Sequence, residues 1–399
     1  MKDKQIEKLI KQEEKRVKKI INLIPSENFA SKDVYTALGS VFDYKYSEGY
    51  PHKRYYGGQT YTDELEELAK ARSLKAFKLS DREWAVNVQP LSGAPANLAV
   101  YLALVPLGGK VMGMTLSAGG HLTHGQKVSI TGKAWQPVPF GVDAKTGLIN
   151  YEEVKEIALR EKPAMIIAGF TAYPRTVDFK KFREIADACG AYLMVDMSHI
   201  AGLIAGGAYP SPFPYADVVT TTTHKTLRGP RGAVIFSRKD KMVKGANGKE
   251  QSIAELIDKA VFPGLQGGPH MSQIAGIAVA MKEAASPAFK TYAKQVIKNA
   301  KVLGEELKKK GWRVISGGTD SHLLLVDTWM DGKGISGKDA AVKLEAGGII
   351  CNFNTIPGET RPPFDPSGIR IGSPSETSRG KKEKDFKKIA EMIDKLLTS

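Results

Sequence analysis

The sequence has few cysteines and no long hydrophobic run. Cys189 and Cys351 are the only cysteines among 399 residues. They lack the CxxC spacing of a zinc or redox site, so we expect both to be inert thiols. The apolar stretches 164–170 and 191–195 are far shorter than the roughly 20 residues that cross a bilayer. The N-terminal residues are charged and lack the apolar segment of a secretory signal, so we expect a cytoplasmic protein with no membrane partner.

The chain is strongly basic. It has 58 Lys and Arg against 43 Asp and Glu, a formal net charge of +15. Such an excess can mark a nucleic-acid-binding protein. Here, however, lysines concentrate in 2–19 and 381–395, where acidic and apolar residues recur at helical spacing. This pattern is typical of solvated helix faces, and we expect no dedicated nucleic-acid site.

Short apolar runs alternate with helical segments between about residues 85 and 240. The runs are 85–88, 110–114, 165–170, 192–196, 218–223 and 233–237. Alternation of this kind predicts an α/β fold with a mostly parallel sheet flanked by helices. Ligands of such sheets bind at the carboxyl ends of the strands.

The chain is expected to have three parts. Residues 1–24 form an N-terminal helix or arm, with one apolar stripe made of Ile6, Leu9, Ile10, Val17, Ile20 and Ile21. A large domain covers residues 25–270 and ends at a segment rich in Gly and Pro. Residues 271–399 form a smaller α+β domain. Its expected helices are 271–285, 288–310, 338–346 and one from about 382, and its expected strands are 312–316, 322–327, 349–353 and 369–372.

The most informative segment is the β-branched run 218–223, which leads into His224 and Lys225. An uncharged lysine at the carboxyl end of a strand can attack an aldehyde. The neighbouring His224, Arg228 and Arg231 would favour this neutral form of Lys225. Taken alone, a lysine in this position is usually only solvated.

Two other strand ends carry groups that suit a pyridine ring and a phosphate. One buried strand ends at Asp196, whose carboxylate could pair with a protonated pyridine nitrogen. Another leads into Ser92-Gly93-Ala94, where free amides at a helix start could bind phosphate. Asp196 could instead be a metal ligand or a helix cap, and Ser92 could be a simple N-cap. In combination with a lysine that can attack an aldehyde, these two strand ends point to a site for a phosphorylated pyridine aldehyde.

Three further segments carry candidate site residues. His121 and His124 lie three residues apart, but no third ligand has suitable spacing, so we expect no metal site and an imidazole of His121 stacked on a cofactor ring. The loop 45–58 gathers tyrosines around Glu48 and could place an acid-base group over a substrate. Arg370 could grip a carboxylate with two hydrogen bonds.

These segments together resemble the serine hydroxymethyltransferases, also called glycine hydroxymethyltransferases. The similarity extends from about residue 23 to 379, through 24–29, 47–51, 53–58, 121–125, 195–199, 220–225 and 266–269. It implies a fold-type I pyridoxal 5′-phosphate (PLP) enzyme that moves the hydroxymethyl group of serine to tetrahydrofolate, leaving glycine and 5,10-methylenetetrahydrofolate. It also implies a homodimer with shared active sites.

The resemblance assigns roles to individual residues. Lys225 would bind PLP covalently, and the other catalytic residues would be Glu48, His121, Tyr46 and Tyr56. The cofactor would be held by Ser92, Gly93, Ala94, Thr171, Asp196, His199 and His224, and by Gly267 and Gly268 of the neighbouring subunit. Serine and folate would contact Ser26, Arg370, Leu116, Gly120, Leu122 and Asn354. The basic surface would attract the glutamate tail of folate.

Two other functions are weighed against this one. A folate-independent PLP aldolase for threonine or other β-hydroxy amino acids would share the cofactor, but four residues argue against it, namely Leu116, Leu122, Asn354 and Glu48. An RNA-binding protein would need a focused cationic face with interleaved aromatic residues, whereas the lysines here are spread along the chain.

The sequence departs from the family at Ala94-Pro95, where many members have Ser-Gln. This difference removes a side-chain donor to the phosphate.

Overall fold

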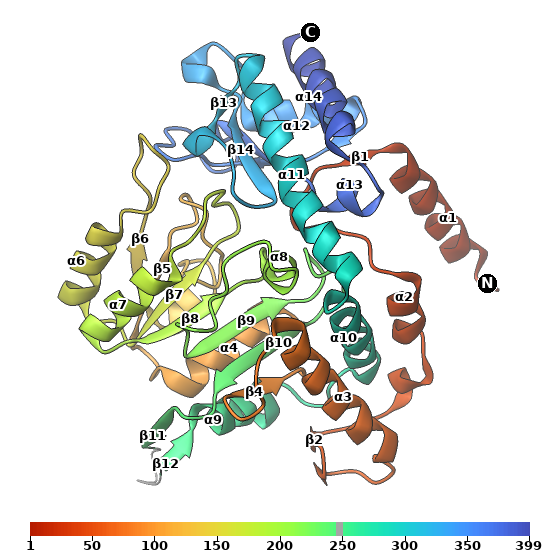
Figure 1. Cartoon of the computed structure of the whole chain (residues 1–399), viewed down its shortest axis with the longest axis vertical. Helices are drawn as coiled ribbons and strands as arrows, with labels where there is room; N and C mark the ends of the chain where they lie inside the picture. The colour runs from red at the N-terminus through yellow and green to blue at the C-terminus, as the bar shows by residue number, and fades with distance from the viewer. Residues whose placement is uncertain (245–249) are drawn as a thin grey trace.

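The computed structural model describes residues 1–244 and 250–399 and contains two main sheets (Figure 1). The larger sheet has seven strands in the order β4-β10-β9-β8-β7-β5-β6, and the smaller has four in the order β13-β14-β17-β16. Strands β9, β8, β7, β5 and β6 run parallel to one another, whereas β10 is antiparallel to both β4 and β9. The predicted α/β class with a mostly parallel sheet is therefore confirmed.

Six strands of the larger sheet lie where the apolar runs predicted them. The seven are β4 (Trp84–Asn87), β5 (Lys110–Met114), β6 (Gln136–Phe140), β7 (Met165–Gly169), β8 (Tyr192–Asp196), β9 (Val218–Thr222) and β10 (Ala233–Arg238). The unexpected strand is β6, which contains Pro137 and Pro139. It forms an edge of the sheet, where a proline removes no ladder hydrogen bond.

Helices cover both faces of the larger sheet. In β7, Ile166 and Ala168 join one core cluster, whereas Met165 and Ile167 join another, as the alternation of side chains along a strand requires. The second cluster includes helices α4 (Gly93–Leu104) and α9 (Ile253–Lys259). The first includes α3 (Thr60–Phe77), α6 (Tyr151–Glu161), α7 (Phe179–Cys189), α8 (Ala201–Ala205) and α10 (Met271–Ala284).

The smaller sheet packs against three helices near the C-terminus. Its strands are β13 (Arg313–Val314), β14 (Leu323–Asp327), β16 (Asn352–Asn354) and β17 (Gly368–Gly372), and its helices are α11 (Pro287–Lys309), α12 (Gly337–Ala346) and α14 (Glu383–Thr398). Helix α11 extends from the larger sheet to the smaller one (Figure 1). Helix α10 packs against α3 and α2 (Lys32–Leu38), beside the larger sheet. The boundary at residues 270 and 271 stays a prediction.

The N-terminal helix is shorter than expected. Helix α1 (Lys4–Lys19) begins after the cap Asp3 and ends before Ile20. Ile21 lies instead in β1 (Ile21–Asn22), which pairs with β15 (Ile349–Ile350), so the stripe predicted to include Ile20 and Ile21 is wrong at this end.

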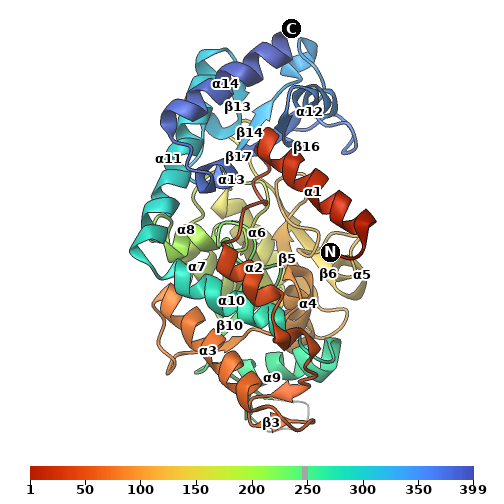
Figure 2. The same cartoon turned by 90° about the vertical axis from the view of Figure 1, so that its right-hand side faces the viewer.

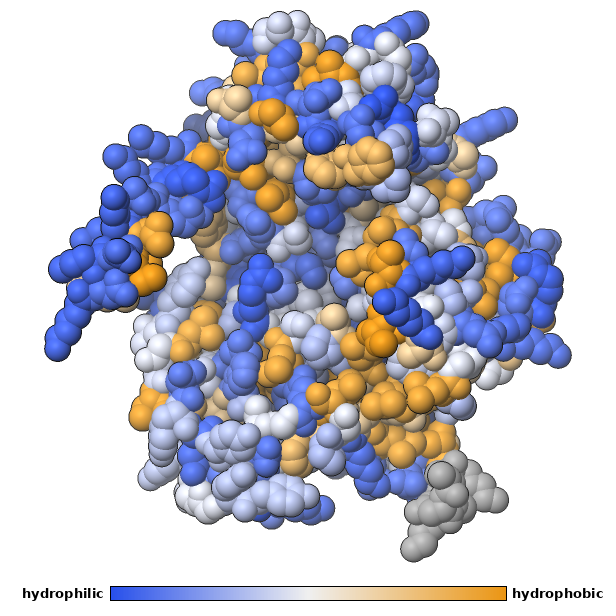
Figure 3. Space-filling view, turned by 180° about the vertical axis from the view of Figure 1, so that it is seen from behind, coloured by the Kyte–Doolittle hydropathy of each residue, from blue (hydrophilic) through white to orange (hydrophobic). Residues whose placement is uncertain are grey.

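The apolar side of α1 is uncovered in the single chain. Ile6, Leu9 and Ile10 are 46%, 60% and 45% exposed, and α1 projects from the body in Figures 1 and 3 and lies in front of it in Figure 2. Within residues 1–244 and 250–399, no helix is both long and apolar enough to cross a membrane.

Candidate active site

The carboxyl ends of β8 and β9 meet the start of α4 at one cavity. Its volume is about 240 Å³, and its lining residues are Ser92, Gly93, Ala94, His121, Phe170, Thr171, Asp196, Ser198, His199, Thr222, His224 and Lys225. All the cofactor residues that were predicted from one subunit therefore share this cavity. It lies where ligands of open α/β sheets bind.

Lys225 lies in this cavity just beyond the end of β9. Its Nζ donates a hydrogen bond to Oγ1 of Thr222 at 3.1 Å. Burial lowers the pKa of Lys225 to about 8, opposed by Asp196 and assisted by Arg370 and Arg231. Burial is thus the main cause of the low pKa of Lys225, whereas the sequence suggested that cationic neighbours would lower it. Arg228 is turned away, with its guanidinium over the ring of Tyr292 at 4.9 Å.

Asp196 is a buried carboxylate surrounded by donors. Its Oδ1 accepts the hydroxyl and the amide of Ser198 at 2.6 and 3.1 Å. Its Oδ2 accepts Nδ2 of Asn97 at 2.9 Å and lies 3.2 Å from Nε2 of His124. Burial favours the protonated acid, but the hydrogen bonds from His124 and Ser198 hold the pKa of Asp196 well below its usual range. An ionised carboxylate here suits a protonated pyridine nitrogen.

The start of α4 offers free hydrogen-bond donors. Ser92 is the N-cap, and within the described residues its hydroxyl makes no capping bond. The first amides of a helix have no acceptor inside that helix. A Cβ added to Gly93 would lie 2.7 Å from Cγ2 of Thr222, so the backbone approaches β9 closely. These donors suit a phosphate even with Ala94 in place of a serine, and together with Lys225 and Asp196 they fit PLP.

The histidines around the cavity are neutral. Burial lowers the pKa of His121 to about 4 and that of His224 to about 3. Nδ1 of His121 lies 2.7 Å from Oγ1 of Thr123. Burial also lowers the pKa of His199 well below its usual range, and its Nδ1 lies 3.1 Å from Nε2 of His322. An uncharged imidazole can stack on an aromatic ring without a charge to desolvate.

Arg370 on β17 reaches the wall of the cavity. Its Nη1 donates to the carbonyl of Thr171 at 2.7 Å and its Nε donates to Oδ1 of Asn352 at 3.0 Å. Burial lowers its pKa to about 10, so the guanidinium stays charged at neutral pH.

Ser26 lines a neighbouring cavity of about 550 Å³, which also includes His224. The structure therefore places Ser26 beside the cofactor cavity and outside its lining.

A third cavity, of about 700 Å³, includes Thr171 and two residues of the predicted folate site, Leu116 and Asn354. The other two predicted contacts are outside its lining. Leu122 is 45% exposed, and the carbonyl of the buried Gly120 accepts the hydroxyl of Thr171 at 2.7 Å. The structure thus brings together half of the predicted folate residues.

Five predicted residues form a separate cluster. The rings of Tyr46 and Tyr56 meet edge to face at 5.2 Å. A Cβ on Gly267 would lie 3.2 Å from Oε1 of Glu48, and a Cβ on Gly268 would lie 3.4 Å from the ring of Tyr46. In the described part of the chain, none of the five lines the cavity around Lys225.

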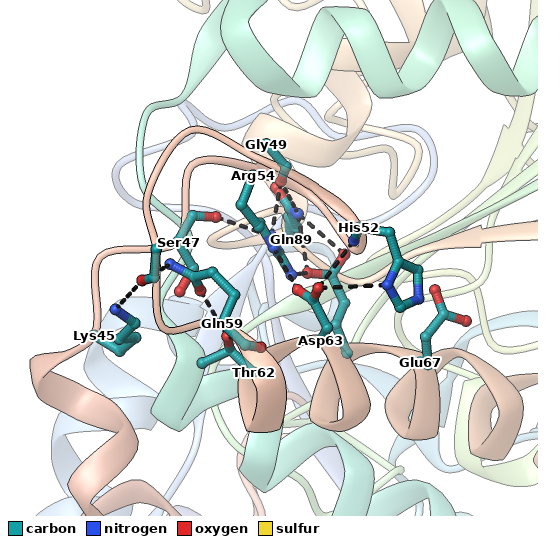
Figure 4. Close-up of polar contacts among 12 residues, drawn as sticks. Lys45, Ser47, Gly49, His52, Arg54, Gln59, Thr62, Asp63, Glu67 and Gln89 are labelled. Carbon is teal, nitrogen blue, oxygen red and sulfur yellow. Dashed lines mark hydrogen bonds and ion pairs between the residues drawn. The ribbon is translucent and has the colours of Figure 1, made fainter.

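A buried arginine holds the loop that carries Glu48 (Figure 4). The side chain of Arg54 is 3% exposed and pairs with Asp63 at 2.9 Å and with Glu66 at 2.7 Å, both on α3. It also donates to the carbonyls on either side of Glu48, those of Ser47 and Gly49, at 2.9 and 2.8 Å. The loop is therefore fixed to α3 by a charge network that spans its base.

Two glutamines connect this cluster to the start of α4. Gln89 donates to the carbonyl of Gly49 at 2.9 Å and to Glu66 at 3.0 Å. The amide of Gln266 donates to the carbonyl of Gln89 at 3.0 Å, and its oxygen accepts the amide of Leu91 at 3.0 Å. The cluster therefore shares its supports with the segment that leads to Ser92.

Sequence reasoning missed several residues that shape the site. Asn97, Ser198 and His322 were not predicted, and His124 was considered only as a metal ligand. Asn97 lies one turn into the helix that begins after Ser92, and Ser198 follows Asp196 by two residues, so their spacing was a usable signal. His322 lies far away in the sequence and gave no signal. Among the described residues, no cluster of His, Cys, Asp and Glu could hold a metal.

A comparison with protein families supports the same chemistry. A family model described as serine hydroxymethyltransferase matches residues 1–393. The match covers both sheets and the cavity around Lys225.

Proposed function

The chain belongs to the serine hydroxymethyltransferase family, and from this premise we propose that Lys225 is the residue that binds its cofactor. The enzyme transfers the hydroxymethyl group of serine to tetrahydrofolate in a reversible PLP-dependent reaction, which leaves glycine and 5,10-methylenetetrahydrofolate. The observation that carries the assignment of Lys225 is its place in one cavity with Asp196 and the first amides of α4.

When bound, PLP supplies an electron sink for negative charge that develops on the amino-acid substrate. The amine of Lys225, with a pKa of about 8, has a substantial neutral fraction near neutral pH and is the group that attaches the cofactor aldehyde. Asp196 keeps the pyridine nitrogen protonated. Ser92, Gly93 and Ala94 hold the phosphate with a hydroxyl and helix amides.

The substrates are bound by residues of the adjoining walls. Arg370 is placed to bind the carboxylate of serine, with Ser26 on the neighbouring cavity. His121, Thr171, His199 and His224 line the cofactor cavity, and the uncharged ring of His121 would stack on the cofactor while the other three would complete its surroundings. Folate would occupy the cavity of about 700 Å³ that includes Leu116 and Asn354, whereas Leu122 and Gly120 lie outside its lining. No observation favours the folate-independent aldolase.

The enzyme is proposed to act as a homodimer with shared active sites. Glu48, Tyr46, Tyr56, Gly267 and Gly268 would enter the cavity of the other subunit, where Glu48 handles the proton of the serine hydroxyl or maintains the protonation of folate. Support comes from apolar side chains that the single chain leaves 43% to 77% exposed, namely Tyr35, Val41, Tyr44, Tyr46, Tyr55, Tyr56, Tyr61 and Leu68. Many exposed apolar side chains within one short part of the sequence, residues 35–68, are typical of a segment that is covered by a partner.

A cytoplasmic location is part of the same proposal. Cys189 and Cys351 are free thiols. Burial raises the pKa of Cys189, and it raises the pKa of Cys351 to about 12. Unpaired cysteines suit a reducing compartment.

Borohydride reduction of the PLP-loaded protein, followed by peptide mapping, tests the assignment of Lys225. We expect the pyridoxyl label on Lys225 and no label at this position in Lys225→Ala. A label on another lysine would refute the assignment. In parallel, glycine release from serine should require tetrahydrofolate, and release at an equal rate without folate would indicate the aldolase reaction.

A further inference from the structure

A pair of buried histidines connects the cofactor cavity to the smaller sheet. His199 follows β8 and lines the cavity, and His322 directly precedes β14. Nδ1 of His199 lies 3.1 Å from Nε2 of His322, and the ring centroids are 5.3 Å apart. Their exposures are 2% and 0%. The backbone of His199 is also held, because its carbonyl accepts the hydroxyl of Thr226 at 3.0 Å.

A contact between two neutral imidazoles requires exactly one proton between the facing nitrogens, and burial keeps the pKa of both His199 and His322 low. Two arrangements satisfy this requirement. In the first, Nε2–H of His322 donates to Nδ1 of His199, and both residues are Nε2–H tautomers. In the second, Nδ1–H of His199 donates to Nε2 of His322, and both residues are Nδ1–H tautomers.

The remaining nitrogen of His322 distinguishes the two arrangements. Its Nδ1 is buried and has no hydrogen-bond partner among the described residues. The second arrangement would leave a buried N–H without an acceptor, whereas the first leaves only a lone pair without a donor. Unpaired buried donors are rarer in proteins than underused acceptors. The first arrangement is therefore favoured.

We propose that His322 is a positioning residue that fixes His199 as the tautomer with its proton on Nε2. Because Nδ1 of His199 faces His322, its Nε2 faces the cavity and presents an N–H donor there. Such a donor recognises an oxygen that carries a lone pair or a negative charge, such as the phenolate oxygen attached to the pyridine ring of PLP. The inference rests on the proposed function only for the identity of that ligand.

Nitrogen-15 NMR of the PLP-loaded enzyme with labelled histidine tests the tautomers directly. The chain has seven histidines, and subtraction of the His322→Gln spectrum assigns the pair. We expect both His199 and His322 to show a protonated Nε2 and an unprotonated Nδ1. Two Nδ1–H tautomers would overturn the proposal. This measurement does not depend on catalysis, whereas failure of the proposed function would appear as borohydride label away from Lys225.

Substitutions at His322 test the consequence for the cofactor. In His322→Phe, we expect His199 to lose its single tautomer and PLP to bind about 10- to 100-fold more weakly, as when the outer partner of a metal-bound histidine is removed. His322→Gln retains an N–H donor and should restore most of the affinity and the Nε2–H signal. Leu324→Ala, a buried change two residues away in β14, is the control and should lower stability with PLP affinity unchanged. Unchanged PLP affinity in His322→Phe would contradict the proposal.

Discussion

The amine of Lys225 titrates closer to neutral pH than a free lysine, so its attachment to PLP should depend on pH. Burial lowers its pKa from 10.5 to about 8, and only the neutral amine attacks an aldehyde. We expect the rate of covalent PLP attachment to apoenzyme to rise about tenfold per pH unit below pH 8 and to level off above it. Stopped-flow absorbance at constant ionic strength measures this profile.

Arg231 provides a second test of the pH profile of PLP attachment. Arg231 is exposed and lowers the pKa of Lys225 through its charge. Arg231→Gln should therefore move the midpoint of the profile to higher pH and leave its shape unchanged. A midpoint near 10.5 in the unmodified enzyme would mean that Lys225 is solvated in solution.

Gly93 and Thr222 should be coupled, because they touch where α4 meets β9. A Cβ on residue 93 would lie 2.7 Å from Cγ2 of Thr222, which is buried. Gly93→Ala should push the start of α4 away from β9, since overpacking costs about 1–3 kcal/mol in stability, and the displaced amides should bind PLP more weakly. Fluorescence titration of apoenzyme with PLP measures this loss.

The second substitution in this pair is Thr222→Ser. It removes Cγ2 but keeps the hydroxyl that accepts a hydrogen bond from Nζ of Lys225. The double variant should therefore regain most of the affinity lost in Gly93→Ala. Equal losses in the single and double variants would show that the contact with Thr222 is not the cause.

Single residues could be predicted where the chemistry is written in the local sequence. Lys225, Asp196 and Ser92 each follow a recognisable strand, and the structure places all three at one cavity. Burial is a property of the folded chain, so neither the main cause of the low pKa of Lys225 nor the contact between His199 and His322 could be predicted.

Among the larger elements, the loop 45–58 depends on the side chain of Arg54, which bonds to two of its carbonyls and to two carboxylates of α3. Arg54 pairs with Glu66, which is 0% exposed. Arg54→Gln leaves that carboxylate without its main partner, and breaking a buried ion pair costs about 3–5 kcal/mol. We expect a loss of this size in urea unfolding and a fall in kcat that exceeds any change in PLP affinity, since the loop carries Glu48.

The adjacent Lys53 supplies a matched control. It is exposed in the same short strand (Lys53–Arg54), so Lys53→Gln should change the unfolding free energy by less than about 0.5 kcal/mol. If both substitutions had equally small effects, the network in Figure 4 would not be what holds the loop.

Elements were predicted best where their pattern is long and uninterrupted. The five-residue runs that form β5 and β8 were found with their correct bounds. The edge strand β6 was missed because its two prolines are typical of a loop. The expected strand 349–353 is two strands, since β15 pairs with β1 while β16 pairs with β17, and a change of partner leaves no trace in hydrophobic periodicity.

At the scale of the whole molecule, the sequence predicted the α/β class and the function, and the resemblance placed Gly267 and Gly268 in the neighbouring subunit, whereas only the structure groups Glu48 and Tyr46 with these glycines. The separation of Glu48 and Gly267 from the cavity around Lys225 depends on how the loop 45–58 packs on α3. Such long-range packing is not encoded in any local motif.

The proposed dimer predicts that two inactive variants will complement each other. Neither Lys225→Ala nor Glu48→Gln should be active as a homodimer. In a heterodimer with shared sites, one site receives both substitutions and the other receives none. Random pairing of equal amounts makes about half of the dimers heterodimers, so about a quarter of the normal activity should return. Co-expression with two affinity tags, followed by an assay of glycine formation, measures this recovery.

The decisive control pairs two substitutions from the same cavity. Lys225 and Asp196 both line the cavity within one chain, so co-expression of Lys225→Ala with Asp196→Asn leaves a lesion in every site of every dimer. No activity should return with this pair, although the same number of heterodimers forms. If the pair with Glu48→Gln also stays inactive while heterodimers are present, Glu48 must act within its own chain, and the cluster around it would have to move toward Lys225 without help from a second subunit.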